Sequence, residues 1–319
     1  MAGRPLIQPT LISIVTPVLN EQDNIPLLYG RIANIFKDSS YRFELILVEN
    51  GSTDRSVDAA LELRRKDDRV KLLSLSRSFG HQIALTAGLD YAQGEAVILM
   101  DSDLQHPPEV IPALIDKWRE GFENVYTIRE PDPSTPFLKR NFSRLFYKIF
   151  RAMTKLNIPQ DSADFRLLDR KIVVELRKFP EKSRFLRGII YWAGYKTTGI
   201  KYQEDKRLHG ETKYNLARSV LLSIDAITSF STVPLYLGVV IGFSIAALGF
   251  LYLFYAFYIF FFTHIRFPGW ASIICLLAIL GGFILIIIGI IGIYIGKIFE
   301  EVKNRPLYLV DRKEGFNEG

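Results

Sequence analysis

The sequence predicts an α/β domain with a mostly parallel, doubly wound sheet, followed by two transmembrane helices. Three observations lead to this prediction. Short apolar segments alternate with segments of helical pattern over roughly the first 100 of the 319 residues, an order typical of parallel sheets. Clusters of polar turn residues follow three of these apolar segments. Residues 226–265 and 267–296 contain no Asp, Glu, Lys or Arg, and each run exceeds the roughly 20 apolar residues that cross a bilayer.

Each element of the domain follows from a local pattern. Apolar runs predict four strands, and helical periodicity predicts the segments between them. The turn at Gly51 is expected to lead into a helix with Ser52 or Asp54 as its N-cap. Ligands of such sheets bind beyond the carboxyl ends of the strands, so the loops after the first, second and fourth strands are expected at one edge. The expected strands are Leu11–Thr16, Phe43–Val48, Val70–Leu75 and Ala96–Met100, and the expected helices include Asn24–Phe36 and His81–Tyr91.

Two carboxylates arrive together at the end of the fourth strand. Asp101 and Asp103 follow the buried run, and Pro107-Pro108 stop the chain from entering a helix at once. Both carboxylates, with the Gln105 carbonyl as a third oxygen, can face one hard cation, and Mg²⁺ or Mn²⁺ commonly bridges such carboxylates to substrate phosphates. The alternative is an ordinary surface turn. The position after a buried strand favours the metal site.

The turn after the second strand offers acceptors for a nucleotide base. The Glu49 carboxylate or the Asn50 amide oxygen could accept from the imide N–H of a base, although the same residues would also suit a well-capped turn. The chain has no G-x-G-x-x-G and no G-x-x-x-x-G-K-[ST] motif, so neither a dinucleotide fold nor a P-loop is supported. A nucleotide diphosphate bridged by a metal fits better.

Five motifs follow one another along the chain: Ile14–Glu21, Val48–Asp54, Asp101–Pro108, Asp161–Leu167 and Arg207–Tyr214. In this order they resemble family 2 glycosyltransferases with a GT-A fold, and the last two resemble the polyisoprenyl-phosphate branch. That branch includes dolichol-phosphate mannose synthase and the bacterial bactoprenol glucosyltransferases. The resemblance covers roughly residues 10–300, both predicted spans included. The family usually has Asp-Asp where this chain has Glu49-Asn50, which leaves open which residue contacts the base.

The resemblance implies roles for the residues at matching positions. Asp103 is implied as catalytic, together with Asp161 and Asp164, of which one could position the acceptor or act as a nominal base and the other could pair with Arg166. The implied ligands of Mg²⁺ or Mn²⁺ are Asp101, Asp103 and Gln105. The implied nucleotide-sugar contacts are Pro17, Asn20, Glu21, Glu49, Asn50, Asp101, Ser102, Arg207 and Lys213. The implied lipid-phosphate contacts are Arg129, Lys139, Arg140 and Ser143.

A basic amphipathic helix is predicted over residues 137–156. Apolar residues recur there at helical spacing with Lys and Arg interleaved, which suits the lipid headgroup boundary. Phe142, Phe146 and Phe150 would enter that boundary, while Lys139 and Arg140 would meet the acceptor phosphate. The alternative is a helix that packs on the core and has a solvated basic face. A second amphipathic stretch, 212–228, is expected to lead into the first span.

The spans determine the predicted domains and location. Residues 1–230 are expected to form the catalytic domain and 231–299 a membrane domain, with 300–319 as a tail. Lys and Arg residues crowd the outer ends of both spans, so the catalytic domain and tail are expected on the cytoplasmic face of a bacterial plasma membrane. The expected spans lie near Val233–Phe262 and Trp270–Ile298.

Cysteine, glycine and histidine residues add three further expectations. Cys275 is the single cysteine, which excludes an internal disulfide. The Gly238/Gly242 and Gly292/Gly296 pairs suit close helix approach; packing of the two spans on each other is their simpler use, and a homo-oligomer is also expected. The histidines lack metal-ligand spacing, and a structural role suits His106 at least as well as a functional one.

These observations predict transfer of one sugar from a nucleotide-sugar to a polyisoprenyl phosphate, with the bilayer as a further partner and no nucleic acid. The resemblance implies inversion, with glucose from UDP-glucose. The acceptor phosphate has a second pKa of about 6, so it is largely ionised at neutral pH and a strong general base is less necessary. A processive polysaccharide synthase is one alternative, but it would carry Q-x-x-R-W and more spans. A non-catalytic membrane scaffold is another, but its metal motif would be broken.

Overall fold

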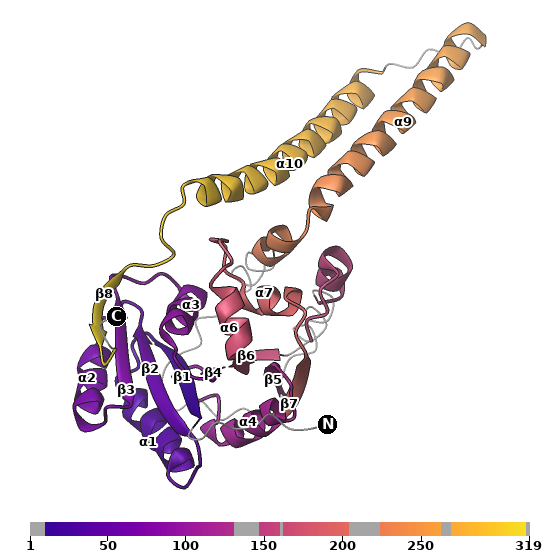
Figure 1. Cartoon of the computed structure of the whole chain (residues 1–319). Coiled ribbons are helices and arrows are strands. Elements are labelled where there is room, and N and C mark those ends of the chain that lie inside the picture. Colours follow the sequence, from indigo (N-terminus) through magenta and orange to yellow (C-terminus); the bar gives the residue numbers. More distant parts are fainter. Residues whose placement is uncertain (1–9, 131–146, 160–161, 204–223, 263–268, 317–319) are drawn as a thin grey trace. The chain divides into compact units, whose positions relative to one another are not determined.

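The computed structural model describes residues 10–130, 147–159, 162–203, 224–262 and 269–316. The chain divides into two compact units (Figure 1). The first, called here the sheet unit, comprises Met1–Leu216 with Pro306–Gly319, and the second, the helical unit, comprises Ala217–Arg305. The final residues of the chain, which follow the helical unit in sequence, therefore belong to the sheet unit.

The sheet unit is built on an eight-stranded mixed sheet in the order β7-β5-β6-β4-β1-β2-β3-β8. The central pairs β4/β1, β1/β2 and β2/β3 are parallel, as is β5/β7, whereas β4/β6, β5/β6 and β3/β8 are antiparallel. The predicted α/β class with a mostly parallel sheet is confirmed. The strands are β1 Leu11–Val18, β2 Arg42–Glu49, β3 Val70–Leu75, β4 Ala96–Leu99, β5 Asn124–Arg129, β6 Ser162–Asp169, β7 Thr197–Tyr202 and β8 Val310–Glu314.

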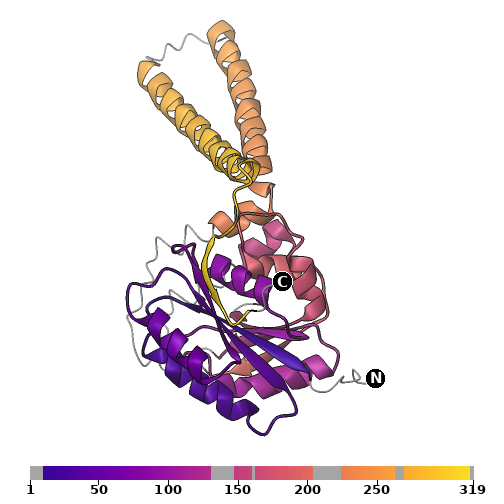
Figure 2. The ribbon, with the colours of Figure 1, turned by 60° about the vertical axis from the view of Figure 1, so that its left-hand side comes forward.

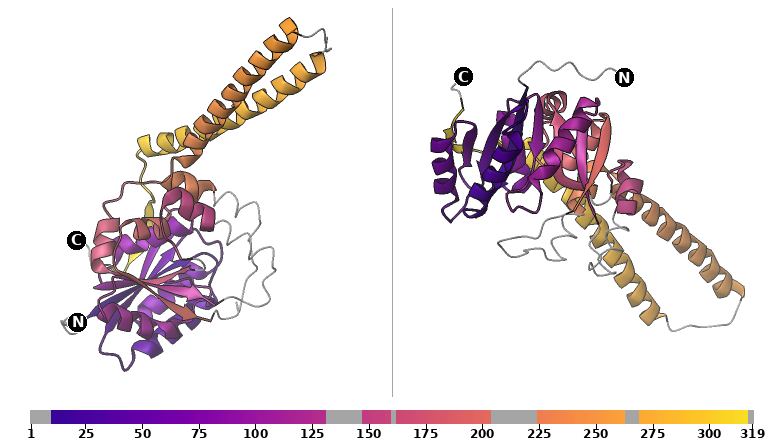
Figure 3. Two further views of the ribbon diagram at one scale, coloured as in Figure 1. Left: turned by 90° about the vertical axis from the view of Figure 1, so that its right-hand side faces the viewer. Right: turned by 90° about the horizontal axis from the view of Figure 1, so that it is seen from below.

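Helices cover both faces of this sheet (Figure 3, left). Apolar side chains of α1, α2 and α4 join one face of the central strands in a continuous core. On the other face α3 lies so close that a Cβ atom on Gly88 would be 2.2 Å from Val15 Cγ1, which explains a glycine inside a helix. The helices of the sheet unit include α1 Asn24–Phe36, α2 Ser56–Lys66, α3 His81–Tyr91, α4 Ile111–Arg119, α6 Arg170–Leu176 and α7 Leu186–Trp192, and η1 Pro108–Val110 is a 3₁₀ turn.

The predicted N-cap of α2 was wrong. The cap position is Arg55, and the helix begins at Ser56. Asp54 stands one residue earlier and accepts from both the backbone N–H (3.0 Å) and the hydroxyl (2.6 Å) of Ser56. The Ser52 hydroxyl instead accepts from the Asn20 N–H (3.1 Å). The Ser52 hydroxyl oxygen, which was predicted to cap α2, therefore bonds the loop after β1 instead.

The predicted basic helix is described only in its second half. Residues 147–154 are helical, and the helix stops before Leu156 because Lys155 adopts a left-handed conformation (φ +58°). Phe150 is 2% exposed and packs edge-on against Phe185 at 6.2 Å between ring centroids. The hypothesis that Phe150 enters the membrane boundary was therefore wrong, since its ring is buried within the sheet unit. Ile149 remains 42% exposed, and residues 137–146 lie outside the described residues.

The helical unit contains two long apolar helices, α9 Val233–Phe262 and α10 Trp270–Val302. By length and composition, Val233–Ile259 and Ile279–Val302 could each cross a membrane. A short helix over 224–230 precedes α9. The Lys297 ammonium on α10 contacts the Asp225 carboxylate (2.7 Å) and donates to Ser229 Oγ (2.6 Å), tying that short helix to the end of α10.

The predicted glycine pairs differ in what surrounds them within the helical unit. A Cβ atom on Gly238 would lie 3.6 Å from Ile287 Cγ1, so the two helices approach there. At Gly242, Gly292 and Gly296 no described atom lies within 4 Å of such a Cβ position. Helix packing within the described part of this unit thus uses one of the four glycines.

The C-terminal residues, expected as a tail, include an edge strand of the sheet. Strand β8 runs antiparallel to β3, and Figure 2 shows the yellow C-terminal strand beside the indigo strands. The Tyr308 hydroxyl donates to the Asp90 carboxylate at the end of α3 (2.9 Å). Burial raises the pKa of that carboxyl. The Phe316 ring packs edge-on against Tyr91 at 5.2 Å.

Tyr308→Phe is expected to destabilise the sheet unit. A hydrogen bond to a charged group contributes about 1.5–3 kcal/mol, and Asp90 keeps 31% side-chain exposure, so we expect about 1.5 kcal/mol. That corresponds to a Tm lower by about 3–6 °C for a domain of this size, measured by thermal unfolding in detergent. Tyr236→Phe, which removes a hydroxyl from a 68% exposed residue, is the control. Equal Tm values for both variants would contradict the prediction.

Candidate active site

Four loops meet at the carboxyl edge of the central parallel strands. The loops follow β1, β2 and β4, and a fourth segment connects β3 to α3. Together they line a pocket of about 290 Å³. The lining residues are Pro17, Val18, Leu19, Glu21, Asn50, Ser78, Gly80, His81, Asp101, Ser102 and Asp103. The predicted edge is thus confirmed as the place where these loops converge.

The Asp101–Asp103 turn is held by contacts on both sides. The Asp101 backbone N–H donates to His106 Nδ1 (3.1 Å), and the Ser102 hydroxyl donates to the Pro17 carbonyl (2.9 Å). The Gln105 N–H donates to Asp103 Oδ1 (3.2 Å), which closes the turn. Leu104 completes it in the left-handed region (φ +61°), a conformation that a residue with a Cβ adopts only when its surroundings impose it. The two carboxylates are therefore pre-positioned at the pocket.

His106 has a structural role in this turn. It is 3% exposed and stacks on Phe165 at 5.2 Å between ring centroids. Its Nδ1 accepts the Asp101 N–H and lies 3.6 Å from Asp101 Oδ2. The imidazole therefore holds the backbone of the turn at Asp101.

The Asp101 and Asp103 carboxylates suit a divalent cation of the Mg²⁺ type. Asp101 Oδ1 is buried and has no hydrogen-bond partner among the described residues, so an oxygen lone pair is left for another ligand. No three His, Cys, Asp or Glu side chains in the described ranges gather as a metal site. A cation held here would complete its shell with oxygens of the substrate and water, as Mg²⁺ does when it bridges one or two carboxylates to phosphates.

The structure separates the two candidates for the base contact. Glu49 is 4% exposed, and its carboxylate accepts from the Ser52 N–H and from the Ser74 hydroxyl (2.7 Å). Asn50 lines the pocket, and its Oδ1 accepts from the Phe79 N–H (2.9 Å). Glu49 therefore holds the turn, while Asn50 is the member of the pair that reaches the pocket.

The other predicted nucleotide contacts after β1 also divide into residues that line the pocket and a residue that holds the loops. Pro17 and Glu21 line the pocket. The Asn20 side chain instead connects two loops, because its Oδ1 accepts a hydrogen bond from the Thr53 N–H (2.8 Å). Asn20 itself adopts a left-handed conformation (φ +60°). It thus joins the β1 and β2 loops.

A polar cluster beside the pocket was not predicted as a unit. Asp164 on β6 accepts from Arg187 Nη2 on α7 (3.0 Å) and from Gln82 Nε2 on α3 (3.1 Å). His81 Nε2 lies 3.9 Å from Asp164 and 3.4 Å from Asp101 Oδ1. Although burial opposes its ionisation, the charges of Arg187, Arg166 and His81 hold the pKa of Asp164 well below its usual range. Of these residues, Asp101 and Asp164 were predicted site residues, whereas His81, Gln82 and Arg187 were not.

Of the remaining predicted site residues, one is described and six lie outside the described residues. Arg129 is exposed at the end of β5. Lys139, Arg140, Ser143, Asp161, Arg207 and Lys213 lie outside the described residues.

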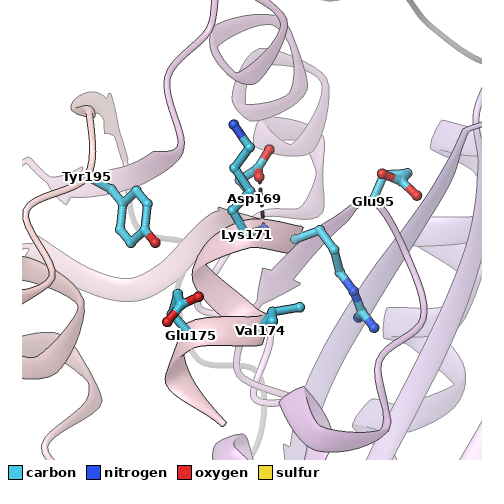
Figure 4. A pocket seen from close by; sticks show the side chains of 7 residues that line it. Glu95, Asp169, Lys171, Val174, Glu175 and Tyr195 are labelled. Atoms are coloured by element: carbon cyan, nitrogen blue, oxygen red, sulfur yellow. Dashed lines mark hydrogen bonds between the residues drawn. The ribbon is translucent and has the colours of Figure 1, made fainter. Parts of the chain in front are cut away.

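A larger pocket of about 680 Å³ lies at the opposite edge of the sheet (Figure 4). Glu95, which lines it, precedes β4, whereas Asp101 follows that strand. Two of its polar side chains hold the fold: Asp169 accepts from Trp118 Nε1 (2.7 Å), and Arg170 donates to the Ala92 carbonyl (2.6 Å). The larger of these two pockets is therefore not the one at which the loops converge.

Comparison with known proteins identifies relatives over nearly the whole chain. The family described as Glycosyl transferase family 2 matches residues 13–177. An uncharacterized glycosyltransferase of Bacillus subtilis (strain 168), YkcC, is 44% identical over 95% of this chain and 94% of its own. The prophage bactoprenol glucosyl transferase homolog of Escherichia coli (strain K12) is 37% identical over 94% of this chain and 98% of its own. The bactoprenol glucosyl transferase of Shigella phage SfII is 37% identical over 96% and 99%.

Proposed function

This chain belongs to glycosyl transferase family 2, and from that membership we propose that it transfers a single glucose from UDP-glucose to a polyisoprenyl phosphate, with inversion. Relatives that match this chain over more than nine-tenths of both lengths are named bactoprenol glucosyl transferases. Bactoprenol is a polyisoprenyl lipid, which supports a lipid phosphate as acceptor. The observation that carries the proposal is the pair of carboxylates, Asp101 and Asp103, facing a pocket at the carboxyl edge of the sheet.

The donor is proposed to bind in this pocket. Asn50 and Pro17 would meet the nucleoside, and Asp101 with Asp103 would face the diphosphate through Mg²⁺ or Mn²⁺. When bound, the cation offsets the negative charge of the departing diphosphate. The chain's own contribution is orientation, because the Gln105 N–H holds the Asp103 carboxylate and the Ser102 hydroxyl holds the turn between the two carboxylates before the donor arrives.

The acceptor phosphate needs little help from a base. Its second pKa is about 6, so an ionised oxygen is available at neutral pH. Asp164 is a poor base, since its pKa lies well below the usual carboxyl range and its oxygens accept from Arg187 and Gln82. We therefore assign Asp164 to positioning. Asp161, Arg129 and Ser143 remain proposed acceptor contacts, with Arg207 and Lys213 proposed for the donor diphosphate.

The helical unit is proposed to anchor the enzyme. Both α9 and α10 are long and apolar enough to cross a bilayer. The Lys and Arg residues that flank the outer ends of α9 and α10 support a cytoplasmic position for the active site. A polyisoprenyl tail stays in the bilayer because each CH₂ exposed to water costs about 0.8 kcal/mol, so an anchored enzyme can reach an acceptor that remains in the membrane.

A donor panel tests this function. The purified protein, in detergent with undecaprenyl phosphate and Mn²⁺, would be offered radiolabelled UDP-glucose, UDP-galactose, UDP-N-acetylglucosamine and GDP-mannose. We expect label to enter the lipid fraction from UDP-glucose and the product to be the β-linked glycolipid, since inversion of the α-linked donor gives that anomer. Transfer from another donor would replace the assigned sugar, and polymeric product would overturn single-sugar transfer.

Lys139→Gln with Arg140→Gln is expected to raise the apparent KM for lipid phosphate at least tenfold. Each charged contact to a phosphate contributes about 1.5–3 kcal/mol, and about 1.4 kcal/mol is a factor of ten. The KM for UDP-glucose should stay at the parental value. Lys148→Gln with Arg151→Gln, which changes exposed cations farther along the predicted helix, is the matched control. Parental KM values in the first variant would remove the acceptor role of both residues.

A further inference from the structure

His81 occupies a position between two carboxylates of different function. It is the first residue of α3, and its imidazole, 43% exposed, lines the pocket. Its Nε2 is 3.4 Å from Asp101 Oδ1 and 3.9 Å from Asp164 Oδ2. One imidazole nitrogen thus lies near Asp101 of the proposed sugar-donor site on one side and near Asp164, which accepts a hydrogen bond at each oxygen, on the other.

One imidazole lies near each oxygen of the Asp101 carboxylate. His81 Nε2 lies beside Oδ1, and His106 Nδ1 lies 3.6 Å from Oδ2. His106 is fixed by its stacking on Phe165. His106 Nδ1 already accepts the Asp101 N–H, so it holds the backbone of the turn and has no proton for Oδ2. The orientation of the carboxylate therefore depends on His81, which must itself be held in place.

Asp164 and Gln82 supply that support for His81. Gln82 donates from Nε2 to Asp164 Oδ2 (3.1 Å), and its Oε1 accepts from the Leu186 N–H at the start of α7 (3.3 Å). Arg187 Nη2 donates to Asp164 Oδ1 (3.0 Å). Asp164 is therefore anchored by groups from two helices, and it presents a fixed charge to the imidazole of His81.

We propose that His81 is a positioning residue that orients Asp101 toward the divalent cation of the donor, and that Asp164 holds His81 through the bonds of Gln82 and Arg187. This inference rests on the proposed donor site. It assigns a role to a residue that sequence reasoning left without one, and to a carboxylate whose low pKa makes it a poor base.

Metal affinity is the readout, because groups behind a metal ligand typically alter affinity about 10–100-fold. Mn²⁺ binding would be measured by electron paramagnetic resonance of free Mn²⁺, with the full-length protein in detergent and saturating UDP. His81→Leu should weaken Mn²⁺ binding at least tenfold and lower kcat, while UDP binding measured without metal stays parental. His81→Gln keeps an N–H donor near the position of Nε2 and should recover a large part of the affinity.

The support of His81 by Asp164 is tested by asking whether the losses of Mn²⁺ affinity in the two single variants add up in the double variant. Asp164→Asn should weaken Mn²⁺ binding, and adding it to His81→Leu should produce no further loss, because coupled residues act through one another. Gln82→Met removes one bond to Asp164 without changing charge, and it serves where Asp164→Asn does not fold. Asp67→Asn, in a distant pair with Arg69, is the control and should keep parental affinity.

Any of these results would overturn the inference: parental Mn²⁺ affinity in His81→Leu, fully additive losses in the double variant, or no Mn²⁺ binding by the parent protein. Loss of metal-free UDP binding in His81→Leu would instead make His81 a direct donor contact and also overturn it. These measurements do not depend on sugar transfer. If the parent protein binds Mn²⁺ and UDP but transfers no sugar to lipid, the proposed function is rejected. The Mn²⁺ measurements would still decide the role of His81.

Discussion

Asp103→Ala is expected to lower sugar transfer about 10³-fold or more while the protein stays folded and membrane-inserted. The Asp103 carboxylate lines the pocket, and stabilising a departing diphosphate is worth several kcal/mol. About 4 kcal/mol corresponds to a factor of about 10³ in rate. The substitution removes an acceptor for the Gln105 N–H, which is a small local change beside the intact strand β4. Initial rates with UDP-glucose and lipid phosphate, at saturating Mn²⁺, measure the effect.

The control for this variant is Asp58→Ala, which removes a carboxylate that is 62% exposed on α2. It should transfer sugar at the parental rate. Chelation by EDTA should abolish transfer by the parent and by Asp58→Ala alike, with recovery on adding Mn²⁺ or Mg²⁺. Turnover by Asp103→Ala equal to that of the parent would contradict the role of this carboxylate.

Arg187→Leu is expected to cause the largest loss of stability among substitutions near the pocket. Removing one partner of a buried ion pair costs about 3–5 kcal/mol, because the remaining charge is left uncompensated. Asp164 retains 23% side-chain exposure and has Arg166 at 4.0 Å, so we expect about 3 kcal/mol. This corresponds to a Tm lower by about 6–12 °C, measured by thermal unfolding in detergent.

The double variant Arg187→Leu with Asp164→Leu distinguishes a lost pair from a lost side chain. Replacing both partners by apolar groups is often nearly neutral, but Asp164→Leu also removes the carboxylate 4.0 Å from the buried Arg166, so the double variant should recover only part of the Tm that the single variant loses. A double variant no more stable than Arg187→Leu would show that the pair contributes through packing. Because the pKa of Asp164 is depressed in the folded state, its contribution is complete above the ordinary carboxyl pKa and declines only as the pH falls below it.

Local sequence was sufficient for several elements of the first 100 residues and for the first long apolar helix. Strand β3 and helices α1 and α3 begin and end where the pattern predicts them, because apolar periodicity and turn residues act over a few neighbours. Helix α9 likewise matches its predicted range, because an uncharged apolar run of that length has few alternatives to a long apolar helix. The Asp101–Asp103 turn could also be predicted, because both carboxylates leave the same strand and need no distant partner to reach the edge.

Tertiary structure decided which of these residues act together. Asp164 is separated from Gln82 by 82 residues and from Arg187 by 23. No local sequence pattern could therefore predict either contact. Glu49 and Asn50 look equivalent in sequence, but Ser74 on the neighbouring strand bonds the first and leaves the second at the pocket. Phe150 has the spacing of a membrane-facing residue, yet Phe185 covers it. Sequence by itself determined the first four strands, the helices between them, the two long apolar helices and the carboxylate turn, whereas the choice among similar polar or aromatic residues depended on contacts that only the folded chain brings together.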